Sequence, residues 1–225
     1  PDFFQAHLNL GAVLNDLGQL QEAEISIRKS IELKPNYANA HSNLGNILRD
    51  LGKLKELIFL SQLTLKSNSI NQGFKLQARL RITIANLLQG DFSKAFLNIN
   101  KTNELINKGA IDTIKGEKNR KNSSNYFRFI SSLYPLLAKE NYNPELEKIP
   151  HIAESHCLSF AHQTLSISSQ LKQIQPVLIM GGKAWHFANN QHNRWKDSLN
   201  QQIKNHTYSN KVLISFGEID CRKDE

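Results

Sequence analysis

The sequence predicts two parts of different fold class: an all-α solenoid of helical hairpins over residues 1–108 and an incomplete α/β domain with a parallel sheet over residues 150–225. The first prediction rests on a repeat with a period of 34 residues, because such a period is typical of stacked helix pairs. The second rests on short apolar runs, bounded by glycine and separated by helical patterns, which are typical of parallel strands with crossover helices. Residues 109–149 are predicted to form a polar linker and a connecting helix.

Composition and charge are those of a globular chain of 225 residues, of which 40% are hydrophobic and 21% charged. No apolar run reaches the roughly 18 residues that a transmembrane helix needs, and the N-terminus has no secretory pattern. With only two cysteines and no zinc-type spacing, we expect a reducing, cytoplasmic location, no metal and no cofactor. Because the chain lacks an initial Met and ends soon after a strand-like run, we also expect a fragment that is cut at both ends.

The net charge of +8 raises the question of a nucleic-acid partner. The densest basic stretch, residues 115–121, lies in the polar connector and contains no aromatic residue on which a base could stack. The sequence therefore favours a solvated linker there and argues against a nucleic-acid partner.

The repeat is clearest at the start of each copy. Ala6-His7-Leu8-Asn9-Leu10-Gly11 recurs as Ala40-His41-Ser42-Asn43-Leu44-Gly45, and Asp16-Leu17-Gly18 recurs as Asp50-Leu51-Gly52. Gly11 and Ala23 are small residues, expected where two helices approach closely. Gly18 is expected where the first helix of the pair ends, and Pro35 follows the second helix, which it cannot continue.

The first copy resembles the tetratricopeptide repeat family. The residues that carry the resemblance are, in order, Leu10-Gly11, Leu14, Gly18, Ala23, Ile27 and Pro35. The resemblance implies repeats over about 4–37 and 38–71, and a weaker one over 74–108 that is anchored by Gly90-Asp91. It further implies a concave groove that binds a protein or peptide.

Four polar residues at matched repeat positions are candidates for contact with such a peptide: His7, Asn9, His41 and Asn43. Two interpretations stay open. Either these side chains line the groove, or the matched histidines only reflect the duplication of the repeat.

After the repeats, residues 107–125 turn polar and are predicted as a linker, followed by a short helix from Tyr126 to Leu137. In the C-terminal part, apolar runs before Glu154, at 177–180 and at 211–217 predict three parallel strands. Helices are predicted between them, over about 158–174 and 189–203. Binding and catalytic sites in such sheets lie at the carboxyl ends of the strands.

The strand ends carry Glu154-Ser155-His156, Gly181-Gly182-Lys183 and Gly217-Glu218-Ile219-Asp220. In this order and context they resemble the SGNH (GDSL-like) hydrolase superfamily, with a flavodoxin-like sheet. The resemblance implies hydrolysis or transfer of an ester, with an acylated sugar as one candidate substrate. It also implies that Ser155 is the nucleophile, that the backbone N–H of Gly182 or Gly181 stabilises the oxyanion, and that Asp220 belongs to the pocket.

The chain departs from the family pattern at two of these positions. Glu154 replaces an aspartate, and Asp220 replaces an amide donor although an ionised carboxylate only accepts hydrogen bonds. Arg222 either supplies a positive charge to the pocket or pairs with Glu218 or Asp220.

The general base is also missing from the sequence. The family's Asp-x-x-His block is expected beyond Glu225, and His156 is only a supporting candidate because it directly follows Ser155. Ser155 has an alternative role as a helix N-cap. The alternative function is therefore a non-catalytic scaffold that binds proteins and carries a degenerate hydrolase-like domain.

Overall fold

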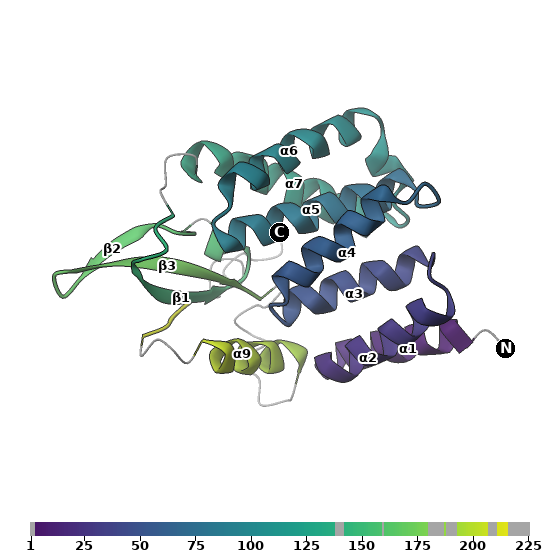
Figure 1. The fold of residues 1–225 in the computed structure, drawn as a ribbon, viewed down its shortest axis with the longest axis horizontal. Helices are drawn as coiled ribbons and strands as arrows, with labels where there is room; N and C mark the ends of the chain where they lie inside the picture. Colours follow the sequence, from purple (N-terminus) through teal and green to yellow (C-terminus); the bar gives the residue numbers. More distant parts are fainter. Residues whose placement is uncertain are drawn as a thin grey trace, which may run out of the picture.

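The computed structural model describes residues 3–137, 142–158, 160–179, 187, 193–206 and 211–215. Three antiparallel helix pairs form the N-terminal part: α1 (Phe3–Asp16) with α2 (Leu20–Leu33), α3 (Ala38–Asp50) with α4 (Leu54–Lys66), and α5 (Gln72–Gln89) with α6 (Phe92–Asn107). The pairs stack in the order of the sequence (Figure 1). The predicted helical solenoid is confirmed for this part of the chain.

A glycine with left-handed backbone separates the two helices of every pair. Gly18, Gly52 and Gly90 have φ values of 80°, 73° and 78°, a region that other L-residues enter at a cost of roughly 1–2 kcal/mol. The next residue in each turn donates its N–H back to the first helix, from Gln19 to the Leu14 carbonyl at 2.9 Å and from Lys53 to the Leu48 carbonyl at 2.8 Å. These bonds satisfy carbonyl groups that the helix end leaves without partners.

The close approach predicted within the first pair is present. A Cβ atom added to Gly11 would lie 2.6 Å from Ile27 Cγ1 and 3.2 Å from the Ala23 carbonyl. Ala23 and Ile27 are fully buried, so α1 and α2 pack at a distance that only a small residue at position 11 allows.

The predicted linker after α6 is wrong, because most of this segment is helical. A short 3-10 helix, η1 (Ala110–Thr113), leads into the long helix α7 (Glu117–Leu137). Residues 117–125 contain no apolar side chain, so no hydrophobic period marked the first half of the helix. Farther along α7, Ile130 and Leu133 are buried in the same core as α5 and α6.

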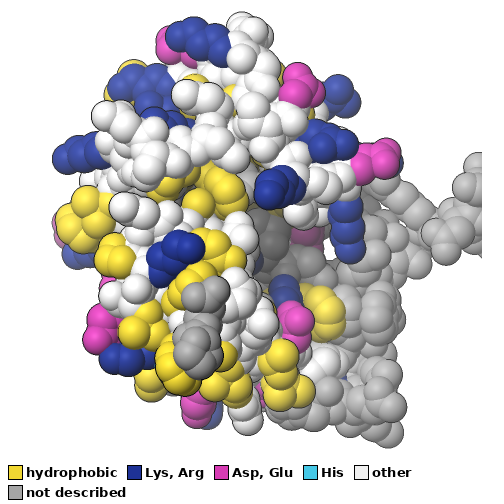
Figure 2. Space-filling model, turned by 90° about the vertical axis from the view of Figure 1, so that its right-hand side faces the viewer, with side chains coloured by type: hydrophobic (Ala, Val, Ile, Leu, Met, Phe, Trp, Pro, Cys, Tyr) yellow, Lys and Arg dark blue, Asp and Glu magenta, His cyan; other side chains and the backbone are white. Residues whose placement is uncertain are grey.

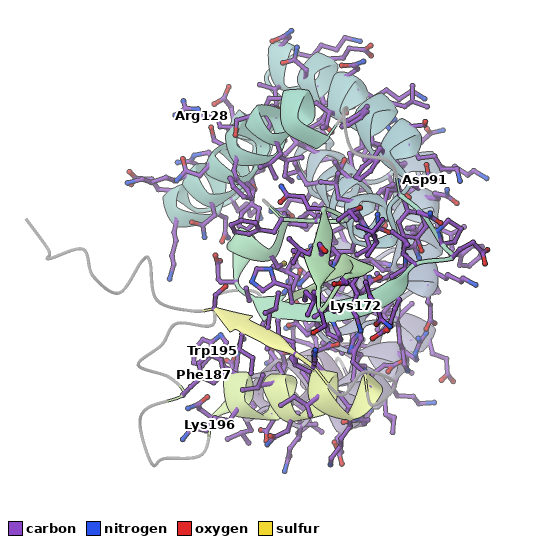
Figure 3. The ribbon with its side chains drawn as sticks, turned by 90° about the vertical axis from the view of Figure 1, so that its left-hand side faces the viewer. Asp91, Arg128, Lys172, Phe187, Trp195 and Lys196 are labelled. Carbon is purple, nitrogen blue, oxygen red and sulfur yellow. The ribbon has the colours of Figure 1, made fainter. Side chains whose placement is uncertain are left out.

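A four-stranded sheet forms the C-terminal part, in the order β2-β3-β1-β4. Its strands are β1 (Glu147–Ala153), β2 (Thr164–Ile167), β3 (Gln170–Leu178) and β4 (Leu213–Ser215). β1 pairs in parallel with both β3 and β4. Helix α9 (Arg194–Asn205) precedes β4 and packs on the sheet through Trp195 and Leu199 (Figure 3). An α/β part with parallel strand pairs is therefore confirmed.

The helix predicted over 158–174 is wrong. The short 3-10 helix η2 (Ser155–Leu158) follows β1, and the chain then forms a hairpin in which β2 is antiparallel to β3. The exposed fraction alternates along β2, as in a half-buried strand. Ser168 and Ser169 turn the hairpin with φ values of 51° and 65°, a geometry that usually requires glycine or asparagine.

The C-terminal part lies along the row of glycine turns. Gly18 packs against Asp197 and Arg194 of α9, and a Cβ added to Gly18 would lie 2.9 Å from Arg194 Cα. The Gln202 side chain of α9 donates to the Asp50 carbonyl, next to the second turn, at 3.0 Å. All three turns thus contact the C-terminal half, since a Cβ on Gly90 would lie 2.7 Å from the Tyr142 ring.

A buried histidine joins the sheet to the end of α5. His162 is fully buried, and its Nε2 lies 2.8 Å from the Leu87 carbonyl. The rings of Phe92 and Tyr142 meet its imidazole edge-on at 5.5 and 5.0 Å. The Gln175 side chain donates to the Leu88 carbonyl at 3.2 Å, so the sheet satisfies acceptors in the last turn of this helix. One hydrophobic core continues from α5 through α7 into β1 and β3.

Substitution of the turn glycines should separate two contributions to the unfolding free energy: the left-handed backbone of the turn, and the contact between the Gly18 turn and α9. Gly52→Ala has only ordinary contacts at 3.7 Å or more, so we expect a loss of about 1–2 kcal/mol of unfolding free energy from the left-handed φ alone. Gly18→Ala should lose more, because its Cβ would also displace α9. Urea unfolding of the full chain measures both losses. Equal losses would contradict the contact between α9 and the Gly18 turn.

Stability should fall on acidification because burial lowers the pKa of His162 below its usual value of 6.5. A folded state that binds fewer protons than the unfolded chain is most stable above about pH 6.5 and loses stability as the pH falls below it. We expect the urea midpoint to be lower at pH 5.5 than at pH 7.5. His162 has a left-handed backbone with φ of 61°. His162→Asn, in which the new residue tolerates this conformation but does not titrate, should reduce this difference. An unchanged difference would exclude His162 as its source.

Candidate functional site

A groove with a cavity volume of about 680 Å³ opens between the first helices of the pairs and α7. Helices α1, α3 and α5 supply one wall, and η1 and α7 supply the other. The lining residues are Leu8, Asn39, Ser42, Asn43, Asn46, Arg49, Asn71, Gly73, Phe74, Gln77, Leu80, Arg81, Ile84, Thr113, Ile114, Lys115, Asn119, Asn122, Ser123 and Tyr126.

Carboxamide side chains dominate the polar lining of the groove. Asn39, Asn43 and Asn46 follow one another along α3 at helical spacing, which places them on one face of that helix. Asn119 and Asn122 do the same on α7. A carboxamide offers both donors and an acceptor, so these side chains, which line one cavity from α3 and from α7, are suited to bond the N–H and C=O groups of an extended peptide.

Arg81 of α5 crosses the floor of the groove to reach α3. Its Nη2 donates to the hydroxyl of Ser42 at 2.6 Å and to the Ser42 carbonyl at 3.2 Å, and its Nε donates to Asn46 Oδ1 at 3.3 Å. Gly45 makes room for this side chain, because a Cβ at that position would lie 3.0 Å from Arg81 Cδ. All three acceptors are neutral.

The groove is electrostatically positive. Burial, together with repulsion from Arg49, lowers the pKa of Arg81 to about 10, so its guanidinium is still charged at neutral pH. The Arg49 charge is offset by Asp50, whose carboxylate oxygen lies 2.8 Å from the guanidinium. Lys115 adds a third cation. Among the residues that the structure describes, no aspartate or glutamate lines the groove.

The structure brings one of the four predicted peptide contacts into the groove lining, namely Asn43. His41 turns away toward the preceding loop, with its Nε2 at 2.6 Å from the Pro35 carbonyl. Asn9 is exposed on α1 and accepts from the Gln5 side chain at 2.9 Å. His7 is half-buried on α1 and is not part of the lining.

Arg81 and Tyr126 were not predicted as groove residues. A signal for Arg81 was present in the sequence: it stands nine residues before Gly90, as Asn43 stands nine residues before Gly52. Counting back from the turn glycine would therefore have found it. Tyr126 had no comparable signal, because α7 lies outside the repeat.

The inner wall of the groove reaches the carboxyl end of β1. Tyr126 lines the groove, and its hydroxyl lies 3.4 Å from Glu154 Oε1, within reach of a long hydrogen bond. Burial raises the pKa of Tyr126, and the nearby Glu154 charge adds to the effect. Glu154 follows the last residue of β1 and precedes Ser155.

The predicted hydrolase residues are only partly within the described chain. Ser155 and His156 begin η2, one residue after the end of β1. The other predicted residues lie outside the described residues: Gly181, Gly182, Glu218, Asp220 and Arg222. Cys157, the next residue of η2, is fully buried. In the described part of the chain, no three His, Cys, Asp or Glu side chains are grouped as metal ligands.

A second surface feature is an apolar area at the N-terminal end. Phe3, Val13 and Ile25 are 63%, 56% and 70% exposed. Figure 2 shows hydrophobic side chains gathered over the lower part of this face, while Lys and Arg side chains are more numerous above.

Comparison with known proteins supports the helical part. The tetratricopeptide repeat family model matches residues 4–37, which correspond to α1, α2 and the turn that follows them. This confirms the predicted tetratricopeptide resemblance for the first helix pair. No curated protein matches the chain. None of the helices in the described residues has the length and apolar character needed to cross a membrane.

Proposed function

We propose that the protein is a protein-binding module and that its groove holds an extended segment of the partner. The observation that carries this proposal is the pair of carboxamide rows on α3 and α7, which face a cavity large enough for several residues of a peptide. The tetratricopeptide match over α1 and α2 supports a role in protein interaction. Backbone recognition of this kind requires a partner segment without secondary structure of its own.

Peptides selected on the full chain test this proposal. We expect a random dodecapeptide phage library to yield peptides that bind the wild-type chain. These peptides should bind the double variant Asn43→Ala/Asn46→Ala at least roughly tenfold more weakly, because each lost hydrogen bond contributes about 1 kcal/mol of binding free energy. Isothermal titration calorimetry with the selected peptides measures this change.

The matched control removes two carboxamides from the opposite side of the repeats. Asn100 and Asn103 are exposed on α6 at the same spacing as Asn43 and Asn46. Asn100→Ala/Asn103→Ala should leave the affinity unchanged. The proposal fails if both double variants bind equally well, or if no peptide is selected.

A second candidate function is hydrolysis or transfer of an ester by the α/β part, with an acylated sugar as one candidate substrate. It is supported by the place of Ser155 near the carboxyl end of β1, a strand with a parallel strand on each side, because ligands of α/β sheets bind at such strand ends. In this proposal Ser155 is the nucleophile, Gly182 donates to the oxyanion and Asp220 belongs to the pocket. The alternative is a scaffold whose α/β part has no catalytic activity.

Hydrolysis of 4-nitrophenyl acetate distinguishes these two alternatives. If the α/β part is a hydrolase, the full-length protein, which is expected to carry the Asp-x-x-His block, should release nitrophenolate faster than buffer, and Ser155→Ala should abolish the excess rate. Ser166→Ala, at an exposed serine of β2, should retain it. Equal rates for wild type and Ser155→Ala would remove Ser155 from the role of nucleophile, and no excess rate would favour the scaffold.

A further inference from the structure

We propose that Ser215 and His151 form a reactive serine–histidine pair, in which Ser215 is a nucleophile toward esters and His151 is its general base. The inference goes beyond the proposed function, because it involves neither the groove of the helical part nor Ser155. It assigns a second nucleophile to the sheet, together with a base that the structure places beside it.

The first argument is the contact between the two side chains. His151 Nε2 lies 2.7 Å from Ser215 Oγ, a distance at which a general base can take the proton of a nucleophilic hydroxyl. In the tautomer that carries its proton on Nδ1, Nε2 accepts the hydrogen bond from the hydroxyl. The two residues lie 64 positions apart in the sequence, so it is the pairing of β1 with β4 that brings them together.

The second argument is the difference in burial between the two residues. His151 is only 5% exposed, and the Phe160 ring packs against its imidazole with the ring centroids 5.7 Å apart. Ser215 is exposed on β4. Nucleophilic catalysis needs an oxygen that the substrate can reach and a base whose orientation is already fixed. A buried imidazole beside an accessible hydroxyl meets both requirements.

The third argument is the place of the pair in the sheet. Ser215 is the last residue of β4, and its register partner is Ala153, the last residue of β1. These strands are parallel, so the hydroxyl lies at an edge where ligands of α/β sheets bind. Phe160 is 48% exposed and supplies an apolar surface beside His151. The substrate class is therefore an ester with an apolar or aromatic acyl group.

The reaction proceeds in two steps with water as the co-reactant. Ser215 Oγ attacks the carbonyl carbon and its proton moves to His151 Nε2. The C–O bond of the ester then breaks, and the alcohol leaves with that proton. Water attacks the acyl-serine and gives a proton to His151, which returns it to Ser215 Oγ as the carboxylic acid leaves.

Labelling of the full chain with an alkyl fluorophosphonate tests the proposal. The serine oxygen bonds to phosphorus, fluoride leaves, and the hydroxyl proton passes to the base, so an activated serine keeps the label. Trypsin digestion and mass spectrometry then locate it, because peptide 212–222 contains Ser215 as its single serine. We expect labelled Ser215, and a labelling rate roughly 100-fold lower in His151→Gln, which removes the base.

The matched control is Ser166, an exposed serine on β2, the strand at the opposite edge of the sheet. It should stay unlabelled under the same conditions. Equal labelling of Ser166 and Ser215 would overturn the proposal, because it would show reaction with any exposed serine. An unlabelled Ser215 would also overturn it, and the bond to His151 would then only join β4 to β1.

The position of the label separates this proposal from the hydrolase proposal for Ser155. Label on Ser155 without label on Ser215 would support the role of Ser155 and overturn the serine–histidine pair. Ser155→Ala should leave the labelling rate of Ser215 unchanged, and a loss of that label would contradict an independent nucleophile. Peptide binding in the groove is measured separately and does not depend on either result.

A second variant tests the base without changing it, in case His151→Gln does not fold. In Ser215→Cys the new thiol lies beside His151, and a neighbouring imidazole raises the thiolate fraction. Iodoacetamide should therefore alkylate it at least tenfold faster than the new thiol of Ser166→Cys. Equal alkylation rates in the two variants would overturn the proposal.

Discussion

The left-handed glycine turn is the constraint on which the rest of the structure depends. At Gly18, Gly52 and Gly90 it ends the first helix of a pair and returns the chain along the second. Repetition of one turn geometry aligns α1, α3 and α5 side by side, and this alignment creates the wall of the groove. The same turns form the row on which α9 and the segment at Tyr142 pack. A change of turn geometry would therefore alter the groove and the docking surface together.

Helix α5 links the groove of the helical part to the sheet of the C-terminal part. Its middle carries Arg81, which reaches across the floor of the groove, and its last turn provides the Leu87 carbonyl that binds His162. A second link runs from Tyr126 in the groove wall to Glu154 beside Ser155. Because one hydrophobic core extends from α5 into β1 and β3, the helical repeats and the sheet support each other. A segment bound in the groove would lie against the wall that touches the end of β1.

Local chemistry explains what could be predicted from the sequence. The helix pairs were predictable because the glycine turns and small packing residues recur at a fixed spacing, and the parallel strands because buried strands are continuous apolar runs. The first half of α7 has no apolar residue, and the β2–β3 hairpin turns on Ser168 and Ser169 rather than glycine, so neither carried its usual signal. The groove needed contacts between distant helices, which a linear pattern does not show. The roles of Gly182 and Asp220 stay predictions.

Hydrogen exchange of the full chain with and without a phage-selected peptide tests the central claim most directly, because it locates the binding site without any substitution. If the groove holds an extended segment, amide exchange should slow in α3, α5 and α7, whose side chains line it, and stay unchanged in α2, α4 and α6. Slower exchange confined to α2, α4 and α6 or to the sheet would contradict binding in the groove.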